Sequence, residues 1–211
     1  MTLVQDIRPT GIYSPYVVDE PFDKAKKTLE DAGCKIITYE QNAGLRVQQG
    51  PEALVSREGN YVAEGGLHMP DGRVLLLHSE YNPIMLSPME ATNANRNEED
   101  FYPTSEQIEW ALSGAYVDLR KGKNYIPAEA FMDDDRTVFM FGENTEAYAD
   151  FLKENDVRGI NIYLANSQDS IFVRQGWFGG FGGRWGVDVG GGDLVRGGRV
   201  RGYKDLGSKV A

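Results

Sequence analysis

Hydrophobic residues at helical spacing predict the first helix of the chain. Phe22, Ala25 and Leu29 fall on one face of a segment over residues 21–32, and a proline and an acidic residue near its start suit a first helical turn. A run of apolar residues over 35–39 follows after a helix-ending glycine, and it predicts a strand.

Two further helices are predicted in the second half of the chain. One begins at Thr104 or the residue after it, because Gln107 stands three positions later and completes a capping box. The other covers residues 145–155, where Tyr148 and Leu152 lie one turn apart on an apolar face. Both helices are long enough to pack against a sheet.

Short apolar runs between the helices predict strands. The turn signal Pro70-Asp71-Gly72 predicts a hairpin that leads into a strand over residues 73–78. Residues 82–103 are polar and irregular, so we expect a long surface connection there. Further strands are predicted over residues 137–141, 160–164 and 171–173. Helices and strands without a repeat indicate an α+β fold.

After Trp177 the pattern changes to isolated large apolar residues among glycines. Twelve of the 25 glycines lie in residues 176–202. Glycine contributes no side-chain burial and loses much conformational entropy on folding, so a surrounding frame must hold this segment through its bulky residues. We predict that Trp177, Trp185, Leu194 and Val200 are largely buried, while Phe178, Asp188 and Arg196 are exposed on one continuous patch.

The charge of the chain is divided in the same way. The 211 residues carry a net charge of −10, yet residues 174–204 carry five Arg and one Lys against two Asp, a net +4. The remainder is therefore strongly acidic, which argues against binding of nucleic acid or anionic membrane through the whole surface. No apolar run approaches the ~20 residues that cross a bilayer, and no secretory signal is visible at the start.

Residues with metal-binding or catalytic chemistry are few and do not form a known pattern. The single cysteine, Cys34, stands among apolar residues and is predicted to be buried. His68 and His78 flank the predicted hairpin without metal-ligand spacing, so we expect solvated or edge-strand histidines. The run Asp133-Asp134-Asp135 is typical of a solvated loop. Phosphate-loop, dinucleotide and nucleophile-elbow motifs are missing, and we expect no catalytic residue, cofactor or metal.

Several short pieces together resemble the variable proteins of diversity-generating retroelements, of the archaeal and viral type. The pieces are Arg-Gln-Gly-Trp-Phe-Gly-Gly-Phe at 174–181 and the closing Arg-Val-Arg-Gly-Tyr at 199–203, preceded by Ser-Pro-Met-Glu-Ala-Thr at 87–92, Phe-Tyr-Pro-Thr at 101–104, Val-Phe-Met-Phe-Gly at 138–142 and Phe-Leu-Lys at 151–153. The resemblance implies a C-type-lectin-like fold with a mixed, mainly antiparallel sheet and two or three helices, and it places the ligand-binding domain over residues 85–211. Residues 1–84 form an N-terminal α/β part, either separate or integral to one compact domain.

The resemblance also implies a codon signature. In such systems adenines of a template are randomised, and randomising the first two bases of AAC or AAT never gives Lys, Glu, Gln, Met or Trp. Trp177 and Trp185 fall outside the reachable set, and both are predicted to be anchors of the scaffold. Lys, Glu, Gln and Met are the other four excluded types. These four types number 38 in the chain, so about five are expected by proportion over residues 176–203, and none is present. Chance combined with a glycine-rich bias is the alternative explanation. The segment also holds more Gly, and less Ser, Tyr and Asn, than random codons would give.

The resemblance implies a non-enzymatic protein that presents a hypervariable surface to a protein or other macromolecular ligand, in the cytoplasm or on a virion. Ligand identity is not a property of such a fold. The alternative is a nucleic-acid-binding module that uses the Arg/Gly-rich segment 196–203. The ligand-facing positions are predicted to be Phe178, Gly179, Gly180, Gly182, Gly183, Arg184, Gly186, Asp188, Gly190, Gly191, Val195, Arg196, Gly197, Gly198 and Arg199.

Overall fold

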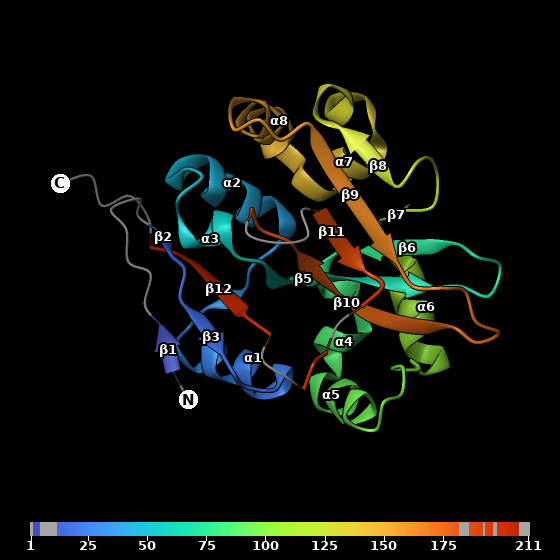
Figure 1. Ribbon diagram of the computed structural model, residues 1–211. Coiled ribbons are helices and arrows are strands. Elements are labelled where there is room, and N and C mark those ends of the chain that lie inside the picture. Colours follow the sequence, from blue (N-terminus) through green and yellow to red (C-terminus); the bar gives the residue numbers. More distant parts are fainter. Residues whose placement is uncertain (1, 5–11, 182–185, 192, 196–197, 207–211) are drawn as a thin grey trace.

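Strands from both halves of the chain pair in one mixed sheet (Figure 1). The computed structural model describes residues 2–4, 12–181, 186–191, 193–195 and 198–206. The main path of the sheet is β1 (Thr2–Val4), β3 (Tyr16–Val18), β12 (Val200–Asp205), β5 (Asn60–His68), β10 (Phe172–Phe178), β11 (Gly186–Val189), β9 (Gly159–Leu164) and β8 (Tyr125–Pro127). Off this path, β6 (Val74–Leu77) pairs with β5 and β7 (Tyr116–Asp118), and β2 (Ile12–Tyr13) and β4 (Lys35–Ile36) pair with β12.

The strand β5 is the centre of the sheet. All nine of its residues are buried, and it pairs with β6 and β10 in antiparallel and with β12 in parallel orientation. Neighbouring residues of a strand point to opposite faces of its sheet. Accordingly Tyr61 and Ala63 belong to one hydrophobic cluster and Val62 to another. The sheet therefore has an apolar core on each face.

Helices cover both cores. The α-helices are α1 (Phe22–Asp31), α2 (Tyr39–Gln49), α3 (Leu54–Arg57), α4 (Pro83–Leu86), α5 (Pro88–Arg96), α6 (Ser105–Ser113), α7 (Asp135–Phe141) and α8 (Thr145–Glu154), and the 3-10 turns are η1 (Ser79–Tyr81), η2 (Ala128–Asp133) and η3 (Gly142–Asn144). One cluster contains apolar residues of α2, α7 and α8, and the other contains those of α1, α4 and α5. Figure 1 shows these two groups of helices on opposite sides of the strands.

Several sequence predictions are confirmed. The helices α1, α6 and α8 lie within a residue or two of their expected bounds, and both hydrogen bonds of the capping box between Thr104 and Gln107 are present. The hairpin β5–β6 turns at residues 69–73, and Cys34 is buried. These elements are governed by local signals that the sequence displays directly.

Other predictions are wrong, and caps explain why. Residues 137–141 form the helix α7 rather than a strand, because the side chain of Asp134 caps it by accepting from the Arg136 N–H. The region 82–103 is not irregular, since Asn82 caps α4 and prolines begin both α4 and α5. The expected strand over 35–39 stops at residue 36, and Thr38 then caps α2.

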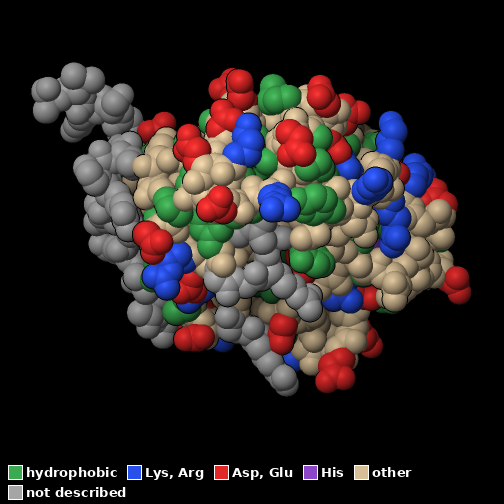
Figure 2. All heavy atoms as spheres, turned by 45° about the horizontal axis from the view of Figure 1, so that its top comes forward, with side chains coloured by type: hydrophobic (Ala, Val, Ile, Leu, Met, Phe, Trp, Pro, Cys, Tyr) green, Lys and Arg blue, Asp and Glu red, His purple; other side chains and the backbone are tan. Residues whose placement is uncertain are grey.

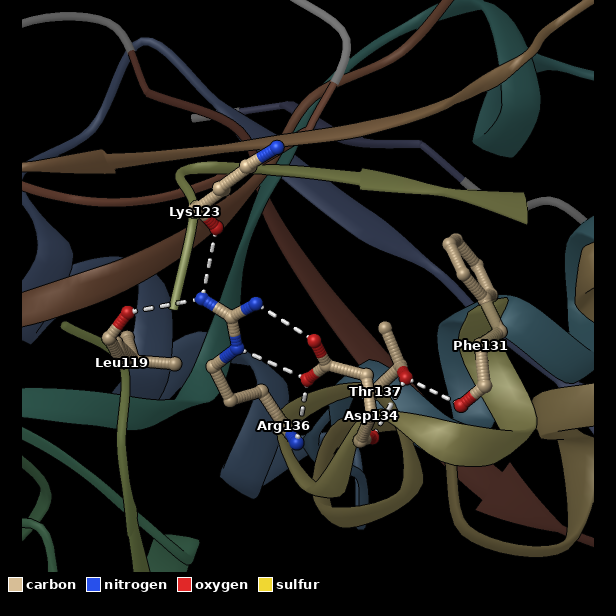
Figure 3. A network of polar contacts seen from close by, with 6 residues as sticks. All are labelled: Leu119, Lys123, Phe131, Asp134, Arg136 and Thr137. Carbon is tan, nitrogen blue, oxygen red and sulfur yellow. Dashed lines mark hydrogen bonds and ion pairs between the residues drawn. The ribbon is translucent and has the colours of Figure 1, made fainter. Parts of the chain in front are cut away.

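The acidic run around Asp134 is a structural element (Figure 3). Asp133 and Asp135 are exposed, as predicted, but Asp134 pairs with Arg136 at 2.6 Å. The same guanidinium donates to the carbonyls of Leu119 and Lys123, at 3.2 and 2.9 Å. Although burial raises the pKa of Asp134, its bonds to Arg136 lower it below the ordinary value overall. The ion pair therefore fastens α7 to the loop after β7.

The expectation that both histidines are solvated or on an edge strand is wrong for His68. Its side chain is fully buried at the end of β5, between β6 and β10, and stacks on Phe172 with 4.4 Å between ring centroids. Its Nε2 lies 2.7 Å from the carbonyl oxygen of Val189, which makes Nε2 the protonated nitrogen. Burial lowers the pKa of His68 to about 4. The residue is a neutral core histidine.

Candidate ligand-binding site

The glycine-rich segment 176–203, called here the display segment, enters along β10, returns along β11 and leaves along β12. The strands β10 and β11 are antiparallel, with Trp177 opposite Asp188 and Phe178 opposite Val187, and β11 continues parallel to β9. Loops connect β10 to β11 and β11 to β12. The described parts of these loops, together with the solvent-facing residues of β11, are where ligand-facing side chains can lie.

The prediction that Phe178 is exposed is wrong. Its side chain has no exposed surface, and its ring lies 5.3 Å from that of Tyr39 and 5.7 Å from those of Phe141 and Tyr148. The guanidinium of Arg46 lies 3.8 Å above the ring centroid. Strand alternation is the reason, because Phe178 and its partner Val187 point to the core shared with α2, α7 and α8. Phe178 therefore belongs to the buried scaffold that surrounds the display segment, called here the frame.

Arg46 holds the turn that follows Phe178. Its side chain is fully buried and donates to the carbonyl of Gly179 at 2.8 Å and to Asn42 at 2.8 Å, with a longer bond to the carbonyl of Phe178 at 3.5 Å. Burial lowers the pKa of this guanidinium, and the neighbouring hydroxyl of Tyr148 opposes that shift. A buried charge needs full hydrogen bonding, and the backbone carbonyls of the display segment supply part of it.

Main-chain hydrogen bonds hold the display segment at further points along its length. Gly179 N–H donates to the carbonyl of Gly186, and Phe181 N–H donates to that of Ser56, both at 2.8 Å. In the other direction, the carbonyl of Leu194 accepts from Phe22, also at 2.8 Å. The carbonyls of Arg199 and Arg201 accept from Tyr61 and Ile37 at 2.8 and 3.0 Å. These bonds depend on the backbone and not on the identity of the side chains.

Of the four bulky residues predicted to be largely buried, two lie buried within the described part of the chain. Leu194 and Val200 are buried, which confirms that expectation. Trp177 is only partly buried and packs edge-on against Tyr61, with ring centroids 5.0 Å apart. Trp185 lies outside the described residues. The anchors among the described residues therefore lie in β10, in β12 and in the loop between β11 and β12.

Several glycines predicted to face a ligand are structural. A Cβ atom at Gly186, whose φ is +143°, would clash with the carbonyl of Asn161, and one at Gly190 would clash with the backbone at Leu164. A Cβ at Gly180 would lie 2.5 Å from the backbone N of Glu58, while at Gly198 it would meet the ring of Tyr61. Gly179 is buried as well. At the four positions Gly180, Gly186, Gly190 and Gly198, close packing leaves no room for another side chain, and Gly179 is buried, so all five are corrected to frame positions.

The remaining described positions reach the surface. Asp188 is partly exposed and its carboxylate accepts from the N–H groups of Gly190 and Gly191, at 2.7 and 2.9 Å. A Cβ at Gly191 would meet only that carboxylate, at 3.6 Å, and Val195 is partly exposed. Arg199 is partly exposed and forms an ion pair with Glu58. The predicted positions Gly182, Gly183, Arg184, Arg196 and Gly197 lie outside the described residues.

Two clefts that the sequence did not indicate border the display segment. One has a volume of about 440 Å³ and is lined by Asn95, Arg96, Glu98, Glu99, Arg174, Asp193 and Val195. The other has a volume of about 400 Å³ and is lined by Pro51, Glu52, Arg57, Asn155 and Phe181. Each combines residues of the display segment with side chains of the frame. They arise from helix ends far apart in the chain, so no sequence pattern marks them.

The closing Val-Arg-Gly is also part of the frame. Arg201 is buried, donates to the carbonyl of Ser14 at 3.1 Å and lies over the ring of Tyr16, 5.1 Å from its centroid. A Cβ at Gly202 would press on Cys34 at 2.9 Å. The absence of a side chain at Gly202 allows β12 to pack closely on Cys34, and the buried side chain of Arg201 ties β12 to the N-terminal residues Ser14 and Tyr16.

The described residues hold no group of three or more His, Cys, Asp or Glu side chains placed to bind a metal ion. Within the same residues, no helix is both long and apolar enough to cross a membrane.

Comparison with solved structures identifies the fold. The chain is similar to a solved structure that illustrates the accommodation of massive sequence variation in Nanoarchaeota by the C-type lectin fold. The two structures superpose with a TM-score of 0.69 and share 13% sequence identity, and the match covers 90% of this chain and 97% of that one. No family model matches the chain, and no curated protein sequence matches it. Together with the mixed sheet and flanking helices described above, the similarity establishes a C-type lectin fold for this chain.

Proposed function

We propose that the chain is a non-enzymatic binding protein whose display segment is diversified by a retroelement and presented to a macromolecular ligand. Its C-type lectin fold is shared with a protein that accommodates massive sequence variation. The absence of Lys, Glu, Gln and Met from residues 176–203 agrees with randomisation at template adenines. The display segment borders two clefts that a ligand can enter.

The main-chain attachment of the display segment carries this proposal. The frame contacts the segment through backbone groups, at Gly179, Phe181, Leu194, Arg199 and Arg201. An exchange of exposed side chains leaves these hydrogen bonds intact, so the frame tolerates variation without losing the position of the segment. A surface built in this way binds with less loss of conformational entropy than a free loop.

The varied positions are fewer than the sequence indicates. Among the described residues we propose Asp188, Gly191, Val195 and Arg199, because their side chains, or a Cβ placed there, reach open space or solvent. The proposal also keeps Gly182, Gly183, Arg184, Arg196 and Gly197.

Nucleic-acid binding is the weaker reading. Of the arginines in the Arg/Gly-rich segment, Arg201 is buried against Ser14 and Arg199 is paired with Glu58. Phosphate contacts require cations that are accessible to the ligand. Figure 2 shows acidic side chains spread across one face of the molecule, with Lys and Arg gathered mainly at its right end. The net charge of −10 also opposes the approach of a polyanion.

A genomic observation tests the retroelement. The coding bases for residues 176–203 should have a near-copy beside a reverse-transcriptase gene, with mismatches between the copies at adenines of the template. A gene without either neighbour would refute diversification.

A display experiment tests the binding surface by itself. One library randomises Asp188, Gly191 and Val195, and a matched library randomises Phe178, Gly180 and Gly186. We expect folded members throughout the first library and a loss of folded protein in most of the second. Selection of the first library against a panel of folded proteins should yield binders. If both libraries fold equally well, the division into frame and varied positions is wrong.

A further inference from the structure

The helical region over residues 79–118, called here the acidic helical surface, differs from the rest of the molecule in charge and exposure. It contains eight acidic residues and one arginine, a net charge of −7 within a total of −10. Ten large hydrophobic side chains are exposed among the described residues, and six of them lie in this region. They are Leu86, Met89, Tyr102, Trp110, Leu112 and Tyr116.

Trp110 is the most prominent of these side chains. It is 49% exposed, although its Nε1 donates to the carbonyl of Glu80 at 3.0 Å and its ring lies 5.3 Å from that of Tyr81. The ring of Tyr81 in turn packs on Gly114, where a Cβ would clash with it. Trp110 is thus fixed before any partner arrives, so binding against it costs little conformational entropy. A rigid, half-exposed tryptophan is a typical hot-spot residue of protein interfaces.

Two further apolar side chains lie at the neighbouring junction of α4 and α5. Leu86 is 54% exposed and Met89 is 56% exposed, on either side of Ser87. The side chain of Gln107 donates to Ser87 Oγ at 3.0 Å and ties this junction to α6. Gln107 precedes Trp110 by three positions, which places both on the same side of α6. The hydrogen bond therefore ties the junction of α4 and α5, which carries Leu86 and Met89, to the side of α6 that carries Trp110.

Exposed carboxylates stand close in sequence to these apolar side chains or on the same helices. Glu80, Glu90, Glu106 and Glu109 are all exposed, and among the described residues none of the four forms an ion pair. Glu106 stands one helical turn before Trp110. An apolar centre with a charged rim of one sign is complementary to an amphipathic segment of the opposite sign.

We propose that the acidic helical surface docks a cationic amphipathic segment of another protein, with apolar side chains on Trp110, Leu86 and Met89 and Lys or Arg on the surrounding carboxylates. None of these three residues lines either cleft beside the display segment. These three docking residues are therefore distinct from the residues that line the clefts, although Asn95, Arg96, Glu98 and Glu99 of the same helical region line one of the clefts.

The test uses the full chain and a fluorescein-labelled helical peptide of roughly 18 residues, with Leu at helical spacing and Lys elsewhere. A second peptide carries Glu in place of Lys. We expect the Lys peptide to bind with an affinity that falls at high salt, and the Glu peptide not to bind. Trp110→Ser and Met89→Ser should each weaken binding at least about fivefold to tenfold. The double variant E106Q and E109Q should weaken it while leaving the fold unchanged.

Matched controls separate the surface from general charge effects. Met132→Ser removes an equally exposed methionine elsewhere, and the double variant E146Q and E154Q removes the same charge from α8. Both controls should bind the peptide as the unaltered chain does, and circular dichroism should show all variants folded. Equal weakening by control and test variants, or binding that survives Trp110→Ser and Met89→Ser, overturns the proposal. So does a dimer that dissociates on Trp110→Ser without peptide binding, since the occupant is then a second copy.

Discussion

Replacing Phe178 by Ala should destabilise the fold far more than any change at a display position. Truncation of a fully buried phenylalanine costs about 3–5 kcal/mol through lost transfer free energy and the cavity that remains. The ring also contacts Tyr39, Phe141 and Tyr148, and such aromatic pairs add about 0.5–1.5 kcal/mol each. The guanidinium of Arg46 loses the ring on which it lies. We expect a total loss at the upper end of the range, about 5 kcal/mol.

That loss is comparable with the whole stability of an ordinary domain, about 5–15 kcal/mol. Urea unfolding followed by tryptophan fluorescence measures it as a lower midpoint with an unchanged slope. The matched change is Val195→Ser, which shortens a partly exposed side chain of the same segment and should alter the unfolding free energy by less than about 0.5 kcal/mol. A loss below about 1 kcal/mol for Phe178→Ala, or a larger loss for Val195→Ser, would refute the assignment of frame and display positions.

Three further predictions concern the frame. Gly186→Ala should destabilise the chain by about 2 kcal/mol or more in urea unfolding, because the new Cβ clashes with the carbonyl of Asn161 at a strained φ; stability equal to that of the parent would contradict the packing. Burial lowers the pKa of His68 to about 4, so the unfolded chain binds a proton at a higher pH than the folded chain does. As the pH falls from 6.5 to 4, the free energy of unfolding should therefore decrease by about 3 kcal/mol. His68→Gln should remove this pH dependence of the unfolding free energy in the same window. Burial raises the pKa of Glu64 to about 8, and the nearby carboxylates add to this shift. The free energy of unfolding should therefore decrease as the pH rises from 4.5 to 8, because the unfolded chain releases the proton first. Glu64→Gln should remove this decrease, and a pH dependence that the substitution leaves unchanged would show that the carboxyl ionises freely.

Local signals explain which elements the sequence could predict. The helix α1 has apolar residues at helical spacing, and α6 has a capping box, so each is specified within a few neighbouring residues. The segment 137–141 has no such periodicity in isolation, and its helical state depends on Asp134, whose carboxylate caps the helix and pairs with Arg136. The buried guanidinium of that ion pair also needs the two carbonyls that the loop after β7 supplies from another part of the chain. Tertiary contacts decide such segments, and a single sequence does not display them.

The candidate site shows the same division. Codon reachability indicates which residue types a position can carry, but it does not indicate the side of the strand. Phe178 stands directly before two glycines in the sequence, yet strand alternation places it opposite Val187 in the core. The glycines look equally free in the sequence, although Gly186 and Gly190 are fixed by the close approach of β9 and the loop that follows it. Of the predicted anchors within the described residues, Leu194 and Val200 could be placed correctly, because isolated large residues in a glycine-rich segment have few other uses.

Because several predicted ligand-facing positions belong to the frame, the proposed surface has fewer variable side chains with which to contact a ligand. Among the described residues, the varied positions Asp188, Gly191, Val195 and Arg199 present too little area by themselves for a specific interface, which needs roughly 800 Å² from each partner. The clefts beside the display segment supply fixed side chains close to it, Arg96 and Glu98 on one side and Arg57 on the other. A ligand would therefore contact constant and varied residues together. Variation then adjusts the affinity of a surface whose general shape and charge belong to the frame, and ligands of different variants should share an element that fits the same clefts.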